Sequence, residues 1–132
     1  MFHPAESVYK SNPIVGNMAV LANSDVKQPI AVVVAHEVNI HTFIAKNNLN
    51  PSNQKDVHHL VKDPKIRSAV LAEINSTGKK AGLSQMELLM GVVLVADEWT
   101  PESGLVTAAQ KLQRKAIEKR YEADIKQAYG SA

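Results

Sequence analysis

Residues Asp97 to Lys115 read DEWTPESGLVTAAQKLQRK and separate two segments of different character. The segment before them, Val92 to Ala96, is almost wholly apolar and does not alternate. This pattern predicts a strand that is covered on both faces or central in a small sheet. The segment after them is amphipathic to the end of the chain. The stretch therefore predicts a loop, Asp97 to Gly104, that leads from a buried strand to a last helix beginning between Lys111 and Lys115.

Length and composition predict one soluble domain, residues 1–132. Of these residues, 45% are hydrophobic and 21% are charged, as in an ordinary globular domain. The net charge of +2 is too small to indicate nucleic acid or a membrane by itself. The absence of cysteine excludes disulfides, thiolate zinc sites and cysteine nucleophiles. The N-terminus lacks the apolar core of a secretory signal, so we expect the cytoplasm or the cytosolic face of an organelle membrane.

Two further strands are expected in the first third of the chain. Met18 to Ala22 is small and apolar, and Pro29 to Ala35 is rich in β-branched valines, with proline at its entry. Between them, Asn23 to Asp25 supplies turn-forming side chains. Because the loop is short, the two strands are predicted to pair antiparallel.

Helical patterns occupy most of the remaining sequence. The clearest begins at Asp63-Pro64, a capping residue followed by the residue best tolerated at the first helical position, and stops near Gly82. The other expected helical segments are Pro4 to Lys10, Asn39 to Leu49, Gln54 to Lys62 and a short turn opened by Ser84 and Glu87 at capping-box spacing.

The last helix is predicted from an apolar stripe at steps of four. Its members are Ile117, Tyr121, Ile125 and Tyr129. Glu122 and Lys126 are correctly oriented for a weak supporting ion pair. Together the elements predict an α+β fold, a small domain with a three-stranded, mainly antiparallel sheet covered by helices.

The histidines do not match a metal site. His36 and His41 are five residues apart with Glu37 between them, whereas a zinc helix needs histidines four apart on one face. On a helix these two would diverge by about 140°. We therefore interpret them as polar loop residues, and the adjacent His58 and His59 as surface residues. No metal site is expected.

The common catalytic motifs are also absent, which leaves one basic cluster. The sequence contains no G-x-x-x-x-G-K-[ST], G-x-G-x-x-G or G-x-S-x-G. Lys111 to Lys115 remains, and a lysine there is a mobile point charge suited to phosphate or carboxylate oxygens. The competing interpretation is a solvated first turn of a surface helix. That position is electrostatically unfavourable for cations, and conflicts of this kind concentrate at functional sites. Trp99 is expected to anchor the preceding loop on the domain rather than to bind a ligand.

Residues 97–115 resemble a segment of a known protein family. DEWTPESGLVT (97–107) followed by KLQRK (111–115) resembles the C-terminal signature of long-chain fatty acyl-CoA synthetases, most closely the fungal members. They belong to the superfamily of AMP-forming acyl-CoA synthetases, luciferases and peptide-synthetase adenylation domains. Further matching segments are ESVY (6–9) with Pro13, GLS (82–84), ELL (87–89) and GV (91–92). The family pattern is K-L-K-R-K, and this chain has Gln113 in place of the middle lysine.

The resemblance implies that the chain is the C-terminal lid domain of an adenylate-forming ligase. In such an enzyme, fatty acid and ATP give an acyl-adenylate, and the acyl group then passes to coenzyme A, with Mg²⁺ assisting. Lys111 matches the adenylation lysine, and Arg114 and Lys115 would support it. The large N-terminal adenylation domain would be the partner, and it would carry the ATP-, Mg²⁺- and acyl-binding parts and any peripheral membrane association. The chain alone is therefore expected to bind none of these cofactors and to be inactive.

Two alternatives stay open from the sequence. The basic last helix could form a binding module for nucleic acid or an anionic membrane. The low net charge, the few aromatics and the lack of a nucleic-acid motif argue against it, so no nucleic-acid partner is expected. The chain could also be a stand-alone interaction or immunogenic domain, which sequence alone does not separate from a lid.

Overall fold

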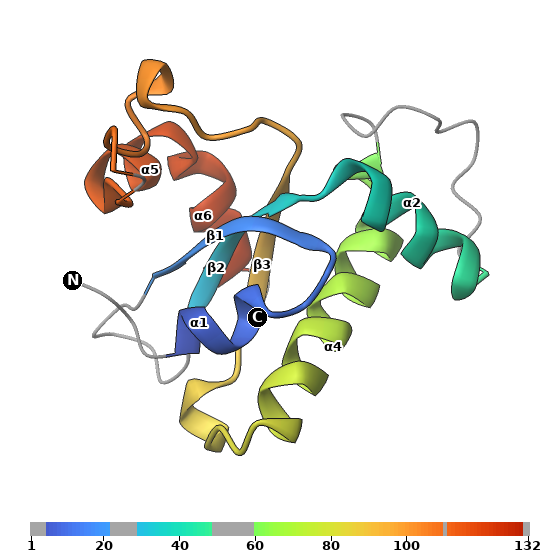
Figure 1. Cartoon of the computed structure of the whole chain (residues 1–132). Coiled ribbons are helices and arrows are strands. Elements are labelled where there is room, and N and C mark those ends of the chain that lie inside the picture. The colour runs from blue at the N-terminus through green and yellow to red at the C-terminus, as the bar shows by residue number, and fades with distance from the viewer. Residues whose placement is uncertain (1–4, 22–28, 49–59, 110, 131–132) are drawn as a thin grey trace.

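The computed structural model describes residues 5–21, 29–48, 60–109 and 111–130, arranged around one small sheet (Figure 1). The strands are β1 (Val15–Leu21), β2 (Ile30–Ala35) and β3 (Gly91–Val95), in the spatial order β1-β2-β3. The α-helices are α1 (Ala5–Lys10), α2 (Glu37–Lys46), α4 (Pro64–Lys80), α5 (Arg114–Arg120) and α6 (Glu122–Gly130). Two short 3₁₀ helices are η1 (Gln85–Glu87) and η2 (Pro101–Ser103). The predicted α+β class with three strands is confirmed.

The sheet is mixed. β1 and β2 pair antiparallel, as predicted, with Met18 opposite Val33 and an irregularity between Val15 and Asn17. β2 and β3 pair parallel, because the chain between them crosses over through α4 and returns to the same end of the sheet. The expected segments lie within two or three residues of the observed strands.

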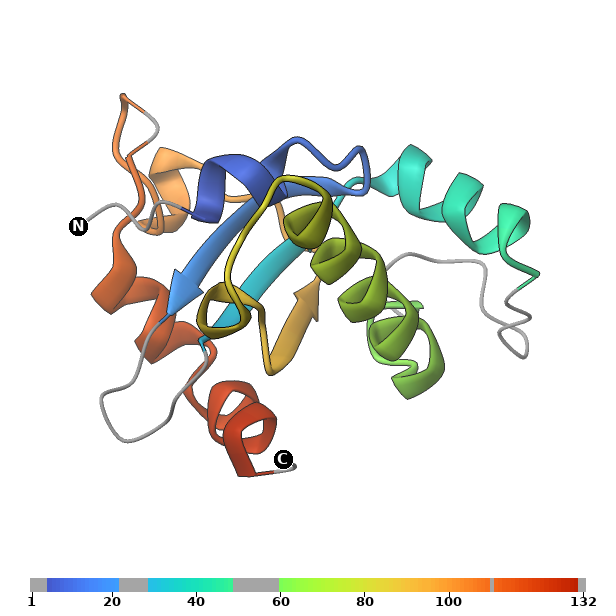
Figure 2. The same ribbon diagram turned by 90° about the horizontal axis from the view of Figure 1, so that it is seen from below.

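Both faces of the sheet are covered, which makes three layers (Figure 2). On one face, α1, α2 and α4 pack on the strands, and on the other lie α5, α6 and the loop after β3. This arrangement explains why β2 and β3 read as continuous apolar runs rather than alternating ones. The central residues of the first core include Tyr9, Val33, Ile66, Val70 and Ile74; those of the second include Val32, Trp99, Leu105, Ile117 and Tyr121.

Helix α4 begins and ends where the local chemistry predicts. The Asp63 carboxylate accepts a hydrogen bond from the backbone N–H of Lys65 at 2.9 Å, and Pro64 is the first helical residue. The helix ends at Lys80, and Gly82 then takes a left-handed φ of 89° that favours glycine. The predicted capping box of Ser84 with Glu87 opens η1. Most of the expected helix from Gln54 to Lys62 lies outside the described residues.

The C-terminal helix begins at Arg114, inside the predicted interval, but it is not continuous. Tyr121 ends α5 in a non-helical conformation (φ −112°, ψ 25°), and α6 follows at once. Of the predicted stripe, Ile117 and Tyr121 are buried and Ile125 is partly buried. The expected Glu122–Lys126 ion pair is present at 3.4 Å. In the part of the chain that the structure describes, every helix is too short or too polar to cross a membrane.

Candidate functional site

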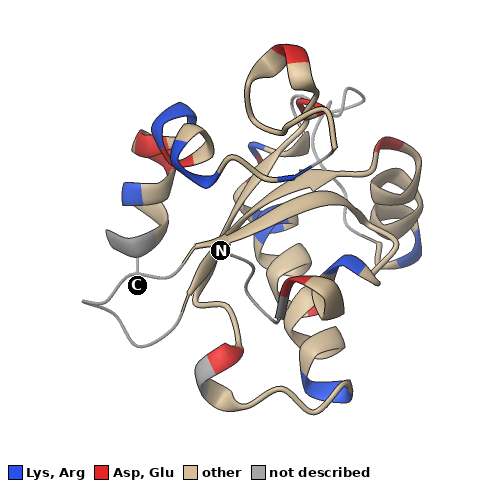
Figure 3. Ribbon diagram, turned by 60° about the vertical axis from the view of Figure 1, so that its left-hand side comes forward, with Lys and Arg blue, Asp and Glu red and all other residues tan. Residues whose placement is uncertain are grey.

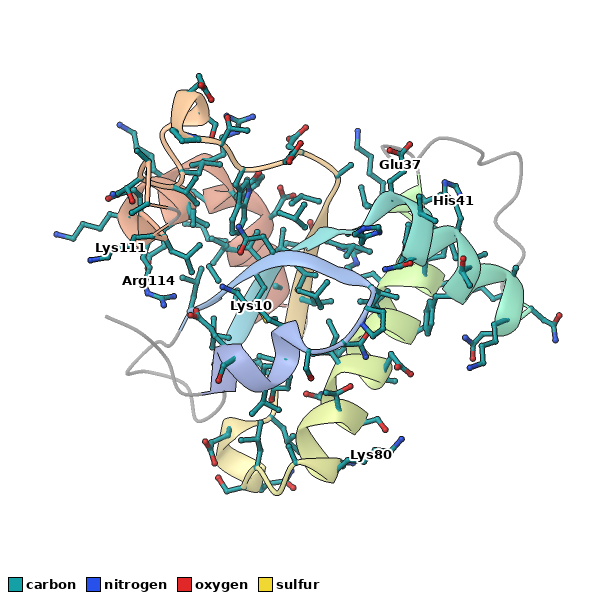
Figure 4. All side chains as sticks on the ribbon, in the orientation of Figure 1. Lys10, Glu37, His41, Lys80, Lys111 and Arg114 are labelled. Carbon is teal, nitrogen blue, oxygen red and sulfur yellow. The ribbon has the colours of Figure 1, made fainter. Side chains whose placement is uncertain are left out.

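Lys111 lies at the end of a small closed loop. The backbone N–H of Thr107 donates to the carbonyl of Lys111 at 2.9 Å, and the N–H of Lys111 donates to Thr107 Oγ1 at 3.1 Å. Next to them, Val106 and Leu112 form an antiparallel bridge. The side chain of Lys111 is exposed, and in Figure 4 it lies on the same side of the molecule as Arg114, far from Glu37 and His41 of α2. The loop therefore holds the backbone of Lys111 while its ammonium reaches into solvent.

The base of this loop is fixed to the second core. Leu105 and Val106 are buried, and the carbonyl of Leu105 accepts a hydrogen bond from the N–H of Gln113 at 2.9 Å. Upstream, Thr100 caps η2, and Gly104 ends it with a φ of 79°. The residues on both sides of Lys111 are thus held by buried side chains and by backbone hydrogen bonds.

Trp99 is the anchor that the sequence predicts. Its side chain is buried, and its indole N–H donates to the hydroxyl of Tyr121 at 3.2 Å. The two rings lie 6.5 Å apart at an interplanar angle of 36°. Burial raises the pKa of Tyr121, so its hydroxyl stays neutral and available as an acceptor. The contact joins the loop after β3 to the junction of α5 and α6.

Arg114 points inward, toward the first helix of the chain. Its Nη1 lies 2.6 Å from Glu6 Oε2 and its Nη2 lies 2.8 Å from Glu6 Oε1, a bidentate pair. Nη1 also donates to the carbonyl of Val20 at 3.1 Å. The Glu6 side chain is fully buried, and that of Arg114 is 20% exposed. The sequence analysis includes Glu6 only in a matching segment and does not predict its pairing with Arg114, because no local pattern links two residues 108 positions apart.

The third predicted residue, Lys115, is exposed near the start of α5. Figure 3 shows that α5 carries much of the positive charge on this side of the molecule. Part of that charge is already compensated, since Arg120 lies 3.7 Å from Asp97. Within the described ranges, no carboxylate lies at ion-pair distance from Lys111. The arrangement thus offers one exposed, unpaired ammonium on a fixed loop, which can neutralise an anion brought to it.

The histidines have ordinary roles where they are described. His36 caps α2, accepting a hydrogen bond at its Nδ1 from the N–H of Asn39 at 3.2 Å, and it is exposed. His41 is also exposed, but the prediction that it is a loop residue is wrong, because α2 begins at Glu37 and includes it. His58 and His59, predicted as surface residues, lie outside the described residues. Among the described side chains, no group of three histidine, aspartate or glutamate residues could hold a metal ion.

The chain is similar to fungal long-chain-fatty-acid–CoA ligases. It is 36% identical over 124 residues to long-chain-fatty-acid–CoA ligase 4 of Saccharomyces cerevisiae, which covers 94% of this chain and 18% of the ligase. It is 40% identical over 116 residues to ligase 1 of the same yeast (85% and 16%), and 36% identical over 126 residues to ligase 1 of Schizosaccharomyces pombe (94% and 18%). No protein-family model matches. The chain is homologous to the C-terminal region of these ligases.

Solved structures agree on the fold. The adenylation domain of the carboxylate reductase from Mycobacterium chelonae superposes with a TM-score of 0.73 at 21% identity, covering 95% of this chain and 17% of that one. The adenylation–carrier didomain of the reductase from Segniliparus rugosus, solved in complex with AMP, gives 0.72 at 21%, covering 96% and 15%. The chain therefore shares its fold with a part of these two adenylation-domain structures, and it spans less than a fifth of the length of the ligases and structures named here.

Proposed function

We propose that residues 1–132 form the lid domain of a long-chain fatty acid–CoA ligase, in which Lys111 supplies the positive charge for adenylation. The observation that carries this proposal is the exposed ammonium of Lys111, which pairs with no carboxylate among the described residues, on a loop that is fixed at both ends. The homology to the C-terminal region of fungal ligases supports it.

The proposed reaction has two steps. The fatty acid carboxylate attacks the α-phosphorus of ATP, and the P–O bond to pyrophosphate breaks, giving acyl-adenylate. The thiol of coenzyme A then attacks the acyl carbon, and AMP leaves as acyl-CoA forms.

The carboxylate and the α-phosphate are both negatively charged, so they repel each other as they approach. A cation placed beside both groups lowers the barrier, because it stabilises the charge that develops between them. Lys111 suits this role since its ammonium is compact and its stem is flexible. Mg²⁺ held by the rest of the enzyme would supply further positive charge on the phosphates.

The proposal requires a partner domain. The sequence holds none of the glycine-rich phosphate motifs named above, and the described residues hold no metal-binding group. We therefore propose that the large adenylation domain binds ATP, Mg²⁺ and the fatty acid, and that this chain alone turns over no substrate. We further propose a location in the cytoplasm or on the cytosolic face of an organelle membrane.

A chimera tests the role of Lys111. Residues 1–132 would replace the homologous C-terminal region of S. cerevisiae long-chain-fatty-acid–CoA ligase 4. Adenylation is measured as pyrophosphate release with palmitate, ATP and Mg²⁺, and transfer is measured from preformed palmitoyl-adenylate to coenzyme A. We expect Lys111→Ala to lower adenylation by about a hundredfold or more, the usual loss for one charge-stabilising group, and to leave transfer unchanged. Lys119→Ala, an exposed change on α5, should alter neither step.

Two results would refute the proposal. If Lys111→Ala lowered the rates of both half-reactions equally, Lys111 would have no role specific to adenylation. Robust acyl-CoA synthesis by purified residues 1–132 would show that no partner domain is needed.

The competing function, a basic binding module, has less support from the geometry. Of the basic residues on α5, Arg114 is engaged with Glu6 and Arg120 lies beside Asp97. These contacts lower the charge available to a polyanion. Tight, strongly salt-dependent binding of the purified chain to DNA or to acidic vesicles would nevertheless favour this alternative.

A further inference from the structure

The carboxylate of Glu6 connects three separate parts of the chain. Glu6 lies in α1 and is fully buried. Its Oε2 accepts a hydrogen bond from the backbone N–H of Val20 in β1 at 2.7 Å, and both of its oxygens accept from Arg114 at the start of α5. Because Arg114 also donates to the Val20 carbonyl, its guanidinium is held at three points. The start of α5 is thereby fixed against the edge of the sheet.

Stability alone is a weak reason for such a pair. Removing two charges from water costs free energy that their attraction only partly returns, and well-packed apolar residues often replace a buried ion pair without loss. A bidentate arginine–carboxylate pair does supply a defined direction, because both groups are planar and fit in one orientation.

Arg114, whose guanidinium is fixed in this way, lies three residues after Lys111 in the sequence. The intervening residues leave little slack, since Leu112 bridges to Val106 and the N–H of Gln113 is bonded to the carbonyl of Leu105. The backbone N–H of Lys111 is itself hydrogen-bonded to the hydroxyl of Thr107, on the N-terminal side of the loop. Any rotation or shift of the start of α5 would therefore move the backbone from which Lys111 projects.

We infer that Glu6 is a positioning residue that, through Arg114, sets the placement of Lys111 for adenylation. This inference rests on the function proposed for Lys111. It also gives Arg114 a different role from direct support of the reacting groups, since its guanidinium faces Glu6 and Val20 inside the domain. Neither residue needs to touch a substrate.

The chimera described above also tests this inference. We expect Glu6→Gln to lower kcat for adenylation by about tenfold to a hundredfold, the loss typical of misplacing a reacting group by about 1 Å. The KM values for ATP and palmitate should stay unchanged, because we propose that the large domain binds both substrates and that Lys111 acts mainly in the transition state. The rate of transfer from palmitoyl-adenylate should also stay unchanged. Glu118→Gln, an exposed change on α5, is the matched control and should have no effect on either step.

A second comparison separates positioning from a general structural role. If Glu6 acts only through Lys111, then Glu6→Gln should cause no further loss of adenylation in a chimera that already carries Lys111→Ala. Arg114→Lys keeps the charge but loses the bidentate geometry, and we expect it to lower adenylation as Glu6→Gln does. If the Glu6→Gln chimera fails to fold by circular dichroism, Arg114→Lys is judged by the same measurements.

Three outcomes would overturn the inference. They are unchanged adenylation in Glu6→Gln, an equal fall in both half-reactions, and an additional loss in the Lys111→Ala background. If Lys111→Ala itself leaves adenylation intact, the proposed function fails. If Lys111→Ala abolishes adenylation and Glu6→Gln does not lower it, only the positioning role fails.

Discussion

Gly78→Ala should destabilise the domain even though alanine is the better helix former. Gly78 is buried in α4, where replacing glycine by alanine normally stabilises a helix by about 1 kcal/mol. Here, a Cβ at this position would lie 2.8 Å from Cε1 of Tyr9, 3.2 Å from its hydroxyl and 3.0 Å from Cδ1 of Leu83. Tyr9 has little room to retreat, because it is fully buried and its hydroxyl donates to the carbonyl of Glu87 at 2.7 Å.

The two effects can be compared in size. Overpacking a core costs about 1–3 kcal/mol, and a strained or broken hydrogen bond from Tyr9 adds about 1 kcal/mol. After the gain in helix propensity is subtracted, we expect Gly78→Ala to lower the free energy of unfolding by about 1–3 kcal/mol. Urea titration followed by far-UV circular dichroism measures this change, with an unaltered slope showing that the unfolded state is comparable.

A control on the same helix isolates the packing effect. Ala72 is exposed on α4, so Ala72→Gly should cost only the propensity difference of about 1 kcal/mol. If helix propensity alone decided the outcome, Gly78→Ala would instead stabilise the domain by a similar amount. A Gly78→Ala variant as stable as the parent, or more stable, would refute the close packing of Tyr9 against α4.

Three further predictions concern buried polar groups. Burial raises the pKa of Tyr9 to about 12, so the folded state keeps a proton that the unfolded state loses above pH of about 10. The free energy of unfolding should therefore fall by up to about 3 kcal/mol between these values because of Tyr9. In urea titrations across that range, Tyr9→Phe should lose this part of the fall and keep the part that comes from Tyr121, whose pKa is also raised. Tyr121→Phe removes the acceptor of the buried Trp99 N–H and should cost about 1–3 kcal/mol in thermal unfolding; an unchanged melting temperature would argue against that bond. In urea, Glu6→Gln should cost about 3–5 kcal/mol because it breaks a buried pair, whereas Glu122→Gln, which breaks an exposed one, should cost less than about 1 kcal/mol; similar losses would contradict the difference in burial.

The elements that the sequence predicted well are those with local causes. Helix α4 follows from the cap at Asp63 and the apolar steps after it, and η1 follows from the hydrogen bonds of Ser84 with Glu87. The antiparallel pair of β1 and β2 follows from two apolar runs joined by a short loop. The caps of α4 and η1 join residues two or three positions apart, and the two paired strands follow one another directly in the chain, so a pattern in the sequence records all three features.

The features that escaped prediction depend on contacts between distant residues. The parallel pairing of β3 depends on how α4 carries the chain back across the sheet. The break at Tyr121 interrupts a stripe whose spacing alone predicts one continuous helix. The ring of Tyr121 lies 6.5 Å from the ring of Trp99, 22 positions away in the sequence, and both side chains are buried in the second core. The spacing of apolar residues along a helix does not record a contact of this kind.

The basic cluster, residues 111–115, contains two residues in different environments, and the sequence alone could not distinguish them. Cations are disfavoured at a helix N-terminus, and that conflict first marked residues 111–115 as unusual. For Arg114, the first residue of α5, the buried Glu6 carboxylate resolves the conflict within the domain. For Lys111, no carboxylate among the described residues does so. Water can solvate the exposed ammonium of Lys111 in the isolated chain, and in the proposed reaction the carboxylate and the phosphate would act as its counter-charges.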